Sequence, residues 1–451
     1  MSSLQVRGLV DGSGTTLRGV VSVPGDKSIS HRALMLSALA DGTSRIDGLL
    51  STGDCQATLT CLRDLGVTIE PVSDGASTSL LVHGRGLRGL RPSQKSLDCG
   101  RSGTTMRLLA GVLAGQSFDS VLTGEPQLLR RPMRRVTDPL RQMGAIISDT
   151  DGHGPLSIRG HGSLRGHTHD LAVASAQVKS AILLAGLYAE GVVNVHLPGP
   201  ARDHTERMLV AQVEPRQAGQ RFLTYDDVSA RLDPSAVSRI LPLVCTVPGD
   251  FSSAAFLMAA GTCVPGAEVT VRDVGTNLTR TGFLDVLRWM GADTTLAEAH
   301  ERGGEPVTDI TVRGSDLKGV MVGGDVVVRM IDEFPVLAVV ATQAAGTTLV
   351  RDAAELRVKE SDRIASVVGE LRKLGATIEP RDDGFLVEGP TMLRGAEVDS
   401  QGDHRLGMAL VVAGLVAQGE TIVHGAERMA DSFPGFVRTM RVLGASIDEC
   451  D

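Results

Sequence analysis

The segment PGDKSISHRALMLSALA, residues 24–40, places cations where a helix is expected to begin. A Pro-Gly turn opens it, Ser28 or Ser30 can cap the helix, and apolar residues then follow at helical spacing. Lys27, Ser28 and Arg32 therefore lie near free backbone N–H groups, which favour an anion. A phosphate-binding P-loop is disfavoured, because an aspartate separates the glycine from the lysine. The alternative without a ligand is a solvated first turn.

Further segments of the first half also combine cations with hydroxyl or amide groups near an expected helix. A solvated arginine run is the alternative interpretation of LTGEPQLLRRPMRRV, but together these groups suit a sugar-like polyol phosphate. The candidates are Arg101 or Arg107 with the glycines of DCGRSGTTMRLLAG, the run Arg130, Arg131, Arg134 and Arg135, then Ser175, Gln177 and Lys179 just before an apolar helix, and Arg202 near a helix start.

The second half sets carboxylates beside cations. A carboxylate next to a cation can be held ionised or tuned for proton transfer, although a charged helix face is the alternative for ELRVKESDR. The groups are Asp332 and Glu333 ahead of an apolar helix, Arg357, Lys359, Glu360, Asp362 and Arg363 within seven residues, and Asp403, His404 and Arg405 at another helix start. Their distribution predicts a site for a ligand with several anionic groups, shared between two domains.

The composition of the chain indicates which kinds of ligand are disfavoured and where in the cell the protein is expected. The 451 residues include 45 basic and 53 acidic ones, a net charge of −8, which argues against a general nucleic-acid or membrane surface. Six scattered cysteines without metal-ligand spacing are expected to be reduced thiols, and no metal site is predicted. The start, MSSLQVRGLVDGSG, lacks a secretory pattern and no apolar run is long enough for a membrane span, so we expect a cytoplasmic protein.

One phrase recurs along the chain and indicates the elements that position these groups. It reads LRDLGVTIE from Leu62, LRQMGAIIS from Leu140, LRWMGADTT from Leu287, LRKLGATIE from Leu371 and MRVLGASID from Met440. Each copy predicts an amphipathic helix that ends at a glycine, followed by a strand. One gap of 147 residues is about two periods, which predicts a sixth, degenerate unit near residues 207–219.

A longer repeat lies over the short one. VPGDKSISHRALM from Val23 resembles VPGDFSSAAFLMA from Val247, 224 residues later, so two similar domains of three units each are expected. A long solenoid is the alternative, although its repeats typically measure about 20 to 50 residues. The stretch 212–245 is the least regular, and locally divergent packing is expected there.

Eight segments together resemble the 5-enolpyruvylshikimate-3-phosphate synthase family, in its bacterial class II branch. They are PGDKSISHRAL, GTTMRLLAG, LTGEPQLLRRPM, SAQVKSAILLAGL, MIDEFP, LRVKESDR, DHRLGMAL and SFPGF, in the family's order. The resemblance implies an α/β fold of two similar domains, each of three βαβαββ units (an inverse α/β barrel), joined by two chain crossings near 21–24 and 246–249. Residues 22–247 would form the first domain, mainly for shikimate 3-phosphate, and residues 1–21 plus 248–451 the second.

The resemblance also implies which residues bind each substrate. Lys27, Ser28, Arg32, Ser175, Ala176, Gln177, Arg202, Asp332 and Lys359 would hold shikimate 3-phosphate. Lys27, Gly103, Arg131, Gln177, Arg363 and Arg405 would surround phosphoenolpyruvate. In the family reaction the 5-hydroxyl attacks C2 of phosphoenolpyruvate, C3 is protonated, and the tetrahedral ketal phosphate then loses phosphate. Asp332 is the candidate base, and Glu360 and Lys27 are candidates for the other proton transfers, which need no metal or cofactor.

Two features qualify the resemblance. Asp431 stands before Ser-Phe-Pro where many members of the family have lysine, so that phosphate contact is doubtful. Gly103, rather than alanine, leaves room for glyphosate, which in this family occupies the phosphoenolpyruvate site. We therefore expect inhibition by glyphosate, and a monomer by family resemblance. The alternatives are the related UDP-N-acetylglucosamine enolpyruvyl transferase, whose first motif resembles SGAKN, and a non-catalytic binder of anionic metabolites.

Overall fold

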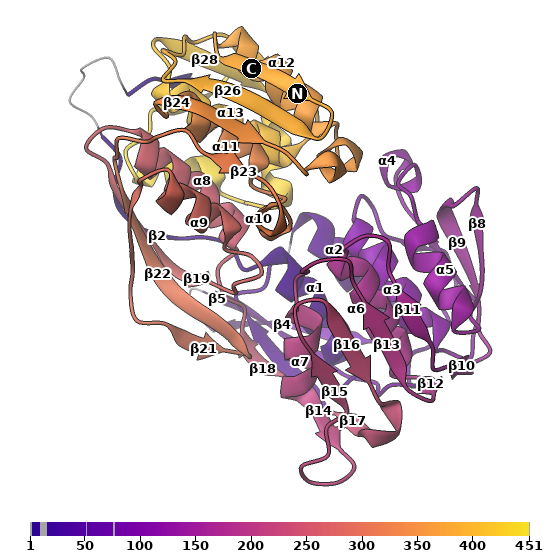
Figure 1. The fold of residues 1–451 in the computed structure, drawn as a ribbon. Coiled ribbons are helices and arrows are strands. Elements are labelled where there is room, and N and C mark those ends of the chain that lie inside the picture. The colour runs from indigo at the N-terminus through magenta and orange to yellow at the C-terminus, as the bar shows by residue number, and fades with distance from the viewer. Residues whose placement is uncertain (1, 10–15, 51, 75–76, 451) are drawn as a thin grey trace. The chain divides into compact units, whose positions relative to one another are not determined.

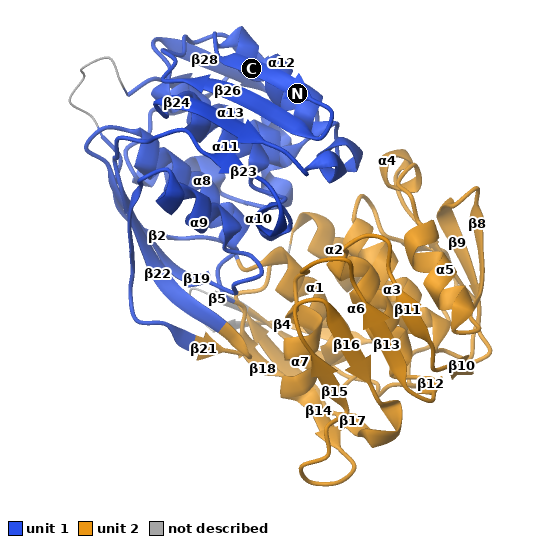
Figure 2. Ribbon diagram, in the orientation of Figure 1, with its two compact units in different colours: residues 1–24, 248–300, 306–451 blue, residues 25–247, 301–305 orange. Residues whose placement is uncertain are grey.

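The structure is a computed structural model that describes residues 2–9, 16–50, 52–74 and 77–450. The chain forms two compact units (Figure 2). Unit 1 comprises residues 1–24, 248–300 and 306–451, and unit 2 comprises residues 25–247 and 301–305. Residues 1–21 were expected in the second domain, and residues 1 and 10–15 of this segment lie outside the described residues.

The boundary between the units falls three residues after the predicted one. Residues 22–24 were expected in the first domain, but the strand β2 (Arg18–Ser22) pairs in parallel with β19 (Glu268–Gly275) of unit 1. The backbone N–H of Asp250 also donates to the carbonyl of Pro24. Residues 301–305 belong to unit 2, where the Glu305 carboxylate contacts the His204 ring at 2.7 Å.

Unit 2, whose elements Figure 1 labels, contains three four-stranded sheets that share one pattern of strand pairing. In each sheet the first two strands are parallel and the remaining neighbours are antiparallel. In sheet order they are β18 (Val244–Thr246), β3 (Thr43–Asp47), β5 (Ser77–His83) and β4 (Thr68–Asp74); β6 (Leu97–Asp98), β7 (Ser120–Thr123), β9 (His153–Arg159) and β8 (Ile146–Thr150); β11 (Thr168–Asp170), β13 (Val193–His196), β16 (Ser229–Leu232) and β15 (Leu223–Tyr225).

The same pattern of pairing recurs in three sheets of unit 1, with β21 (His300–Arg302) as an extra strand beside β22. The N-terminal strand β1 completes a sheet of this unit, between β28 and β29. In sheet order the strands are β2, β19, β22 (Glu305–Arg313) and β20 (Asp293–Leu296); β23 (Met321–Val322), β24 (Gly346–Val350), β26 (Gly384–Gly389) and β25 (Thr377–Arg381); β27 (Glu397–Asp399), β28 (Glu420–His424), β1 (Ser3–Arg7) and β29 (Ile447–Cys450).

The recurring phrase forms the predicted helix, glycine and strand. Its glycines adopt φ between +84° and +106°, a conformation that costs glycine little and ends each helix. The helices are α2 (Gly53–Asp64), α5 (Arg134–Gln142), α9 (Gly282–Trp289), α12 (Arg363–Lys373) and α14 (Phe436–Val442), and they lead into β4, β8, β20, β25 and β29.

The sixth unit is present but interrupted. Its helix α7 (His204–Gln212) continues directly into the strand β14 (Val213–Pro215) instead of ending at a glycine. β14 pairs with β17 (Val237–Ile240), and β15 and β16 lie between them in sequence. An inserted pair of strands therefore explains why the phrase is degenerate at residues 207–219.

Each unit has three buried helices that begin at the motifs of the sequence. In unit 2 they are α1 (Lys27–Ala38), α3 (Gly103–Ala114) and α6 (Ala176–Gly186); in unit 1 they are α8 (Phe251–Cys263), α11 (Phe334–Thr342) and α13 (His404–Val416). They supply much of two separate hydrophobic cores, one to each unit. Two compact units, each with its own core, replace the solenoid alternative.

The described residues contain neither a disulfide nor a helix that could span a membrane. All six cysteines lie in the described part and none forms a disulfide. Among the described residues, the helices are too short or too polar to cross a membrane.

Candidate active site

The first motif of unit 2 begins α1, but not with the expected cap. The carboxylate of Asp26 accepts a hydrogen bond from the backbone N–H of Ile29 at 2.9 Å, so Asp26 caps the helix. Neither Ser28 nor Ser30 does, because both lie inside the helix, and the Ser30 hydroxyl accepts from the N–H of Leu50 instead. Lys27 and Ser28 consequently occupy the first turn of α1.

Lys27 has a carboxylate partner that the sequence analysis missed. Its Nζ lies 3.2 Å from Oδ2 of Asp54, and the two side chains are only 17% and 24% exposed. Asp54 lies in the first turn of α2, where an acidic residue is favoured by the helix dipole. Its place in the first turn of a helix was the one feature of the sequence that could have identified Asp54 as a site residue. The pair leaves a cation and a carboxylate close enough to exchange a proton.

The side chain of Arg32 is held by three helices. Its Nε donates to the hydroxyl of Thr205 at 2.7 Å and its Nη2 to that of Ser180 at 2.8 Å. Burial lowers the pKa of Arg32 to about 10, so the guanidinium remains charged at neutral pH. This arrangement fixes a cation with only 4% of its surface exposed.

Gln177 joins α6 to α3. Its side-chain carbonyl accepts from Nη1 of Arg107 at 2.6 Å, and its amide donates to the Thr104 hydroxyl at 2.9 Å. Of the two alternatives left open by the sequence, Arg107 therefore belongs to this cluster. Arg101 instead donates to the side chain of Gln127 at 2.8 Å.

Gly103 lies against two guanidinium groups. A Cβ added there would be 2.7 Å from Nη1 of Arg107 and 3.1 Å from Nη1 of Arg131. Both distances are shorter than ordinary contacts, so a side chain at this position would displace the arginines. The absence of a side chain at Gly103 thus sets how closely the arginines approach the start of α3.

The remaining predicted residues of unit 2 lie at two helix starts. Ser175 precedes α6, Ala176 is its first residue, and Arg202 lies two residues before α7. Gln177 and Lys179 were expected before the helix but lie within α6, which begins earlier than the apolar pattern alone indicated.

Buried hydroxyl groups connect the starts of α1, α2 and α3. The Nδ1 of His31 lies 2.7 Å from the hydroxyl of Thr58, which lies 2.7 Å from that of Thr105. The Thr105 hydroxyl in turn donates to Ser102 at 2.7 Å. Burial lowers the pKa of His31 to about 3, so this histidine is neutral and links the helices without adding charge.

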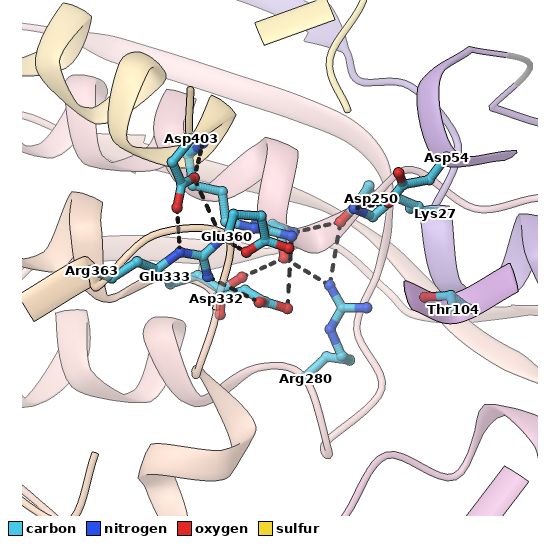
Figure 3. Close-up of polar contacts among 12 residues, drawn as sticks. Lys27, Asp54, Thr104, Asp250, Arg280, Asp332, Glu333, Glu360, Arg363 and Asp403 are labelled. Atoms are coloured by element: carbon cyan, nitrogen blue, oxygen red, sulfur yellow. Dashed lines mark hydrogen bonds and ion pairs between the residues drawn. The ribbon is translucent and has the colours of Figure 1, made fainter. Parts of the chain in front are cut away.

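Three carboxylates surround Arg363 in unit 1 (Figure 3). Its Nε lies 2.8 Å from Asp403, its Nη2 lies 2.7 Å from Glu360, and its Nη1 lies 3.5 Å from Asp332. Burial alone would lower the pKa of Arg363, but these carboxylates outweigh it and raise the pKa above the usual arginine value. The guanidinium is therefore a permanent cation.

Asp332 lies between two arginines. Its Oδ1 faces Arg363 and its Oδ2 lies 3.7 Å from Nη2 of Arg405. Two adjacent cations favour the ionised carboxylate, which is the form a general base requires. Burial would raise the pKa of Asp403, but the Arg363 charge outweighs it and lowers that pKa.

Lys359 of unit 1 has a lowered pKa. Burial lowers its pKa to about 8, while the nearby carboxylate of Asp332 opposes that change. A lysine with this pKa is partly neutral in mildly alkaline solution, so its affinity for an anion depends on pH.

The start of α8 holds a second network that the sequence analysis missed. Nη2 of Arg280 donates to the hydroxyl of Ser252 at 2.8 Å and lies 3.3 Å from Asp250. Ser252 also donates to the buried carboxylate of Glu333. The signal for Asp250 was the longer repeat, in which it corresponds to Asp26, but nothing in the sequence singled out Arg280.

Asp431, the departure from the family pattern, lies at the end of a short 3₁₀ helix (Ala426–Asp431). Its carboxylate is 4.0 Å from Nη1 of Arg428. Within the described ranges, no group of three or more histidine, cysteine or acidic side chains is placed to bind a metal ion.

Comparison with known proteins adds the family context of these clusters. Residues 12–440 match the family model described as EPSP synthase (3-phosphoshikimate 1-carboxyvinyltransferase). The 3-phosphoshikimate 1-carboxyvinyltransferase of Herpetosiphon aurantiacus is 50% identical over 422 residues, which cover 93% of this chain and 95% of the relative. That of Geobacillus kaustophilus is 50% identical over 433 residues, 95% of this chain and 98% of the relative. A solved EPSP synthase of Acinetobacter baumannii is 41% identical with a TM-score of 0.87, and all of both chains is covered.

Proposed function

The chain belongs to the EPSP synthase (3-phosphoshikimate 1-carboxyvinyltransferase) family, and from this premise we propose how its residues carry out the reaction. The enzyme transfers the enolpyruvyl group of phosphoenolpyruvate to the 5-hydroxyl of shikimate 3-phosphate and releases phosphate, a step of aromatic amino acid biosynthesis. The observation that carries this conclusion is the match over residues 12–440, together with relatives of the same name that are 50% identical.

Shikimate 3-phosphate binds at the helix starts of α1, α6 and α7 in unit 2. Ser28, Arg32, Ser175, Ala176, Gln177 and Arg202 supply this set, with Lys359 and Asp332 from unit 1. Arg32 supports the assignment because its guanidinium is fixed by Thr205 and Ser180. A fixed planar donor suits the oxygens of a phosphorylated polyol, because less side-chain entropy is lost when the ligand binds.

Phosphoenolpyruvate binds through a second set of cations. Lys27, Gly103, Arg131 and Gln177 of unit 2 and Arg363 and Arg405 of unit 1 make up this set. The carboxylate partners of Arg363 raise its pKa above the usual arginine value, so it is charged at neutral pH. Guanidinium groups bind carboxylates and phosphates through paired hydrogen bonds.

The proton transfers follow from the same side chains. Asp332, held beside Arg363 and Arg405, accepts the proton of the 5-hydroxyl as it attacks C2 of phosphoenolpyruvate. Lys27 and Glu360 protonate C3 during the addition. They then take a proton back from the resulting methyl group as the C2=C3 double bond re-forms, and they supply the proton of the departing phosphate. The cations then stabilise the charge of the phosphate as the C2–O bond breaks.

A phosphate-release assay with purified protein tests the function. Release should require both shikimate 3-phosphate and phosphoenolpyruvate, and Lys27→Met should abolish it while Lys95→Met, at an exposed lysine, should leave it unchanged. Release with UDP-N-acetylglucosamine as acceptor would instead indicate the related transferase. Heat of binding without any release would indicate a non-catalytic binder.

Inhibition by glyphosate at the phosphoenolpyruvate residues is part of the proposal, and the arginines beside Gly103 support it. The monomeric state, the cytoplasmic location and the sharing of one active site by two domains stay predictions. Sedimentation of the purified protein would test the first of these.

A further inference from the structure

Each of the three guanidinium nitrogens of Arg32 donates one hydrogen bond within the protein, and further N–H groups remain. Nε donates to Thr205, Nη2 to Ser180, and Nη1 to the backbone carbonyl of Ser28 at 2.9 Å. A guanidinium carries five N–H groups, so these three bonds leave one N–H on each terminal nitrogen. Two donors on one guanidinium can bind two oxygens of a phosphate or a pair of hydroxyls.

The two hydroxyl groups that orient Arg32 also bind each other. Ser180 Oγ of α6 lies 2.6 Å from Thr205 Oγ1 of α7, and both side chains are buried. Because a hydroxyl has two lone pairs, each can accept from Arg32 while one donates to the other. The plane of the guanidinium is therefore set by how α6 lies against α7.

A buried ion pair occupies the next position on both helices. Lys179 Nζ lies 2.5 Å from Glu206 Oε1, and both side chains are 0% exposed. In the part of the chain that the structure describes, neither charged group has a hydrogen-bond partner beyond this contact. Such a pair adds little net stability compared with apolar residues of the same size, because both charges lose their hydration. Stability alone therefore does not account for it.

We propose that Thr205 and Ser180, together with the Lys179–Glu206 ion pair, are positioning residues that orient Arg32 toward shikimate 3-phosphate. The inference rests on the proposed function of Arg32. The ion pair and the hydroxyl pair join residues 179 with 206 and 180 with 205, so they fix the register of α6 against α7. Glu206 also adds a negative charge beside Arg32: burial lowers the pKa of Arg32, and Glu206 is the largest of the charges that oppose this change.

Substitution of Thr205 tests the hydroxyl contact. Thr205→Val keeps the shape and removes the acceptor, so KM for shikimate 3-phosphate should rise about tenfold, the usual size of a lost hydrogen bond to a charged group. KM for phosphoenolpyruvate should change less than about twofold, and Thr205→Ser should restore the wild-type value. Thr262→Val is the matched control, because Thr262 is a buried helical threonine whose hydroxyl bonds no described group.

The double variant Lys179→Met/Glu206→Met tests the ion pair. Removing both charges leaves neither one buried alone, so Tm should stay equal or rise, whereas KM for shikimate 3-phosphate should rise at least about fivefold. A pair with only a structural role would leave the ratio of the two KM values at its wild-type level, whatever the change in Tm.

The outcomes separate this inference from the function on which it rests. If the wild type releases phosphate only with shikimate 3-phosphate present, the proposed function holds, and wild-type KM ratios in both variants would overturn the positioning role alone. A wild type without that release would overturn both. A selective rise in KM for shikimate 3-phosphate in both variants, with the Thr262→Val control unchanged, would establish the inference.

Discussion

Arg363 and Asp403 form an almost wholly buried ion pair in unit 1, with 2.8 Å between Nε and Oδ2. Asp403 also caps α13 by accepting from the N–H of Arg405 at 2.9 Å. One carboxylate thus holds the Arg363 cation and the helix start that carries Arg405. Both arginines belong to the set proposed for phosphoenolpyruvate, so the pair connects the stability of unit 1 to the proposed site.

Asp403→Asn should lower the stability of unit 1 and weaken the binding of phosphoenolpyruvate. Asparagine can still cap the helix but leaves a buried cation short of one counter-charge, which typically costs about 3 kcal/mol of unfolding free energy. KM for phosphoenolpyruvate should rise at least about tenfold, measured by phosphate release. Asp362→Asn is the matched control, since Asp362 caps α12 on the surface and pairs with Arg357. Equal effects of the two substitutions would remove the special role of Asp403.

Asp332→Asn should abolish turnover and largely spare binding. The amide has nearly the shape of the carboxylate but cannot accept a proton from the 5-hydroxyl, so kcat should fall by about 10² or more. Shikimate 3-phosphate should still bind, as measured by calorimetry, because the arginines and hydroxyls of unit 2 are unchanged. Near-normal turnover would exclude Asp332 as the base.

Gly103→Ala should reduce inhibition by glyphosate. The new methyl group would approach Arg107 and Arg131, and the arginines must move to accommodate it. We expect the inhibition constant to rise at least about tenfold, with a smaller rise in KM for phosphoenolpyruvate. Gly369→Ala, in α12, is the control because a Cβ there meets no atom within 4 Å. Unchanged inhibition in Gly103→Ala would contradict the steric argument.

Lys359 should make substrate binding depend on pH. Its pKa of about 8 means that the free protein loses this charge as pH rises through 8, so KM for shikimate 3-phosphate should increase between pH 7.5 and about 9.5. Lys359→Arg keeps the charge over that range and should remove the increase, whatever its effect on the absolute KM. A parallel rise in the variant would assign the dependence to another group.

His31 should make unfolding depend on pH in acid. Its pKa is about 3 in the folded protein and about 6.5 when unfolded. Above pH 6.5 the ring is neutral in both the folded and the unfolded protein, so His31 does not reduce the unfolding free energy there. Below that, the unfolded chain binds a proton that the folded chain does not, and the unfolding free energy falls by about 1.4 kcal/mol per pH unit toward pH 3.

Urea unfolding between pH 6.5 and 4.5 measures this contribution. His31→Gln cannot titrate and should have a slope shallower than that of the wild type by this amount. His161→Gln, at an exposed histidine, should keep the wild-type slope. Identical slopes in the wild type and His31→Gln would show that His31 is not a buried neutral group.

The repeated helix, glycine and strand could be predicted from the sequence, because the pattern is local. A glycine with positive φ ends a helix whatever surrounds it, and the apolar spacing identifies the face that is buried. The starts of the buried helices, with Lys27, Gly103 and Arg405 in their first turns, were visible for the same reason. The Asp26 cap was misassigned to a serine because several residues nearby are able to cap.

Contacts between residues distant in the chain were decided only by the tertiary structure. Nothing local to Asp54, Arg280 or Thr205 says which cation or hydroxyl it meets, since each contact depends on how two helices or loops pack. The same holds for the charges: the lowered pKa of Lys359 and the permanent cation of Arg363 follow from burial and neighbouring carboxylates. Residue types fixed which chemistry was available, and packing determined which groups are close enough to carry it out.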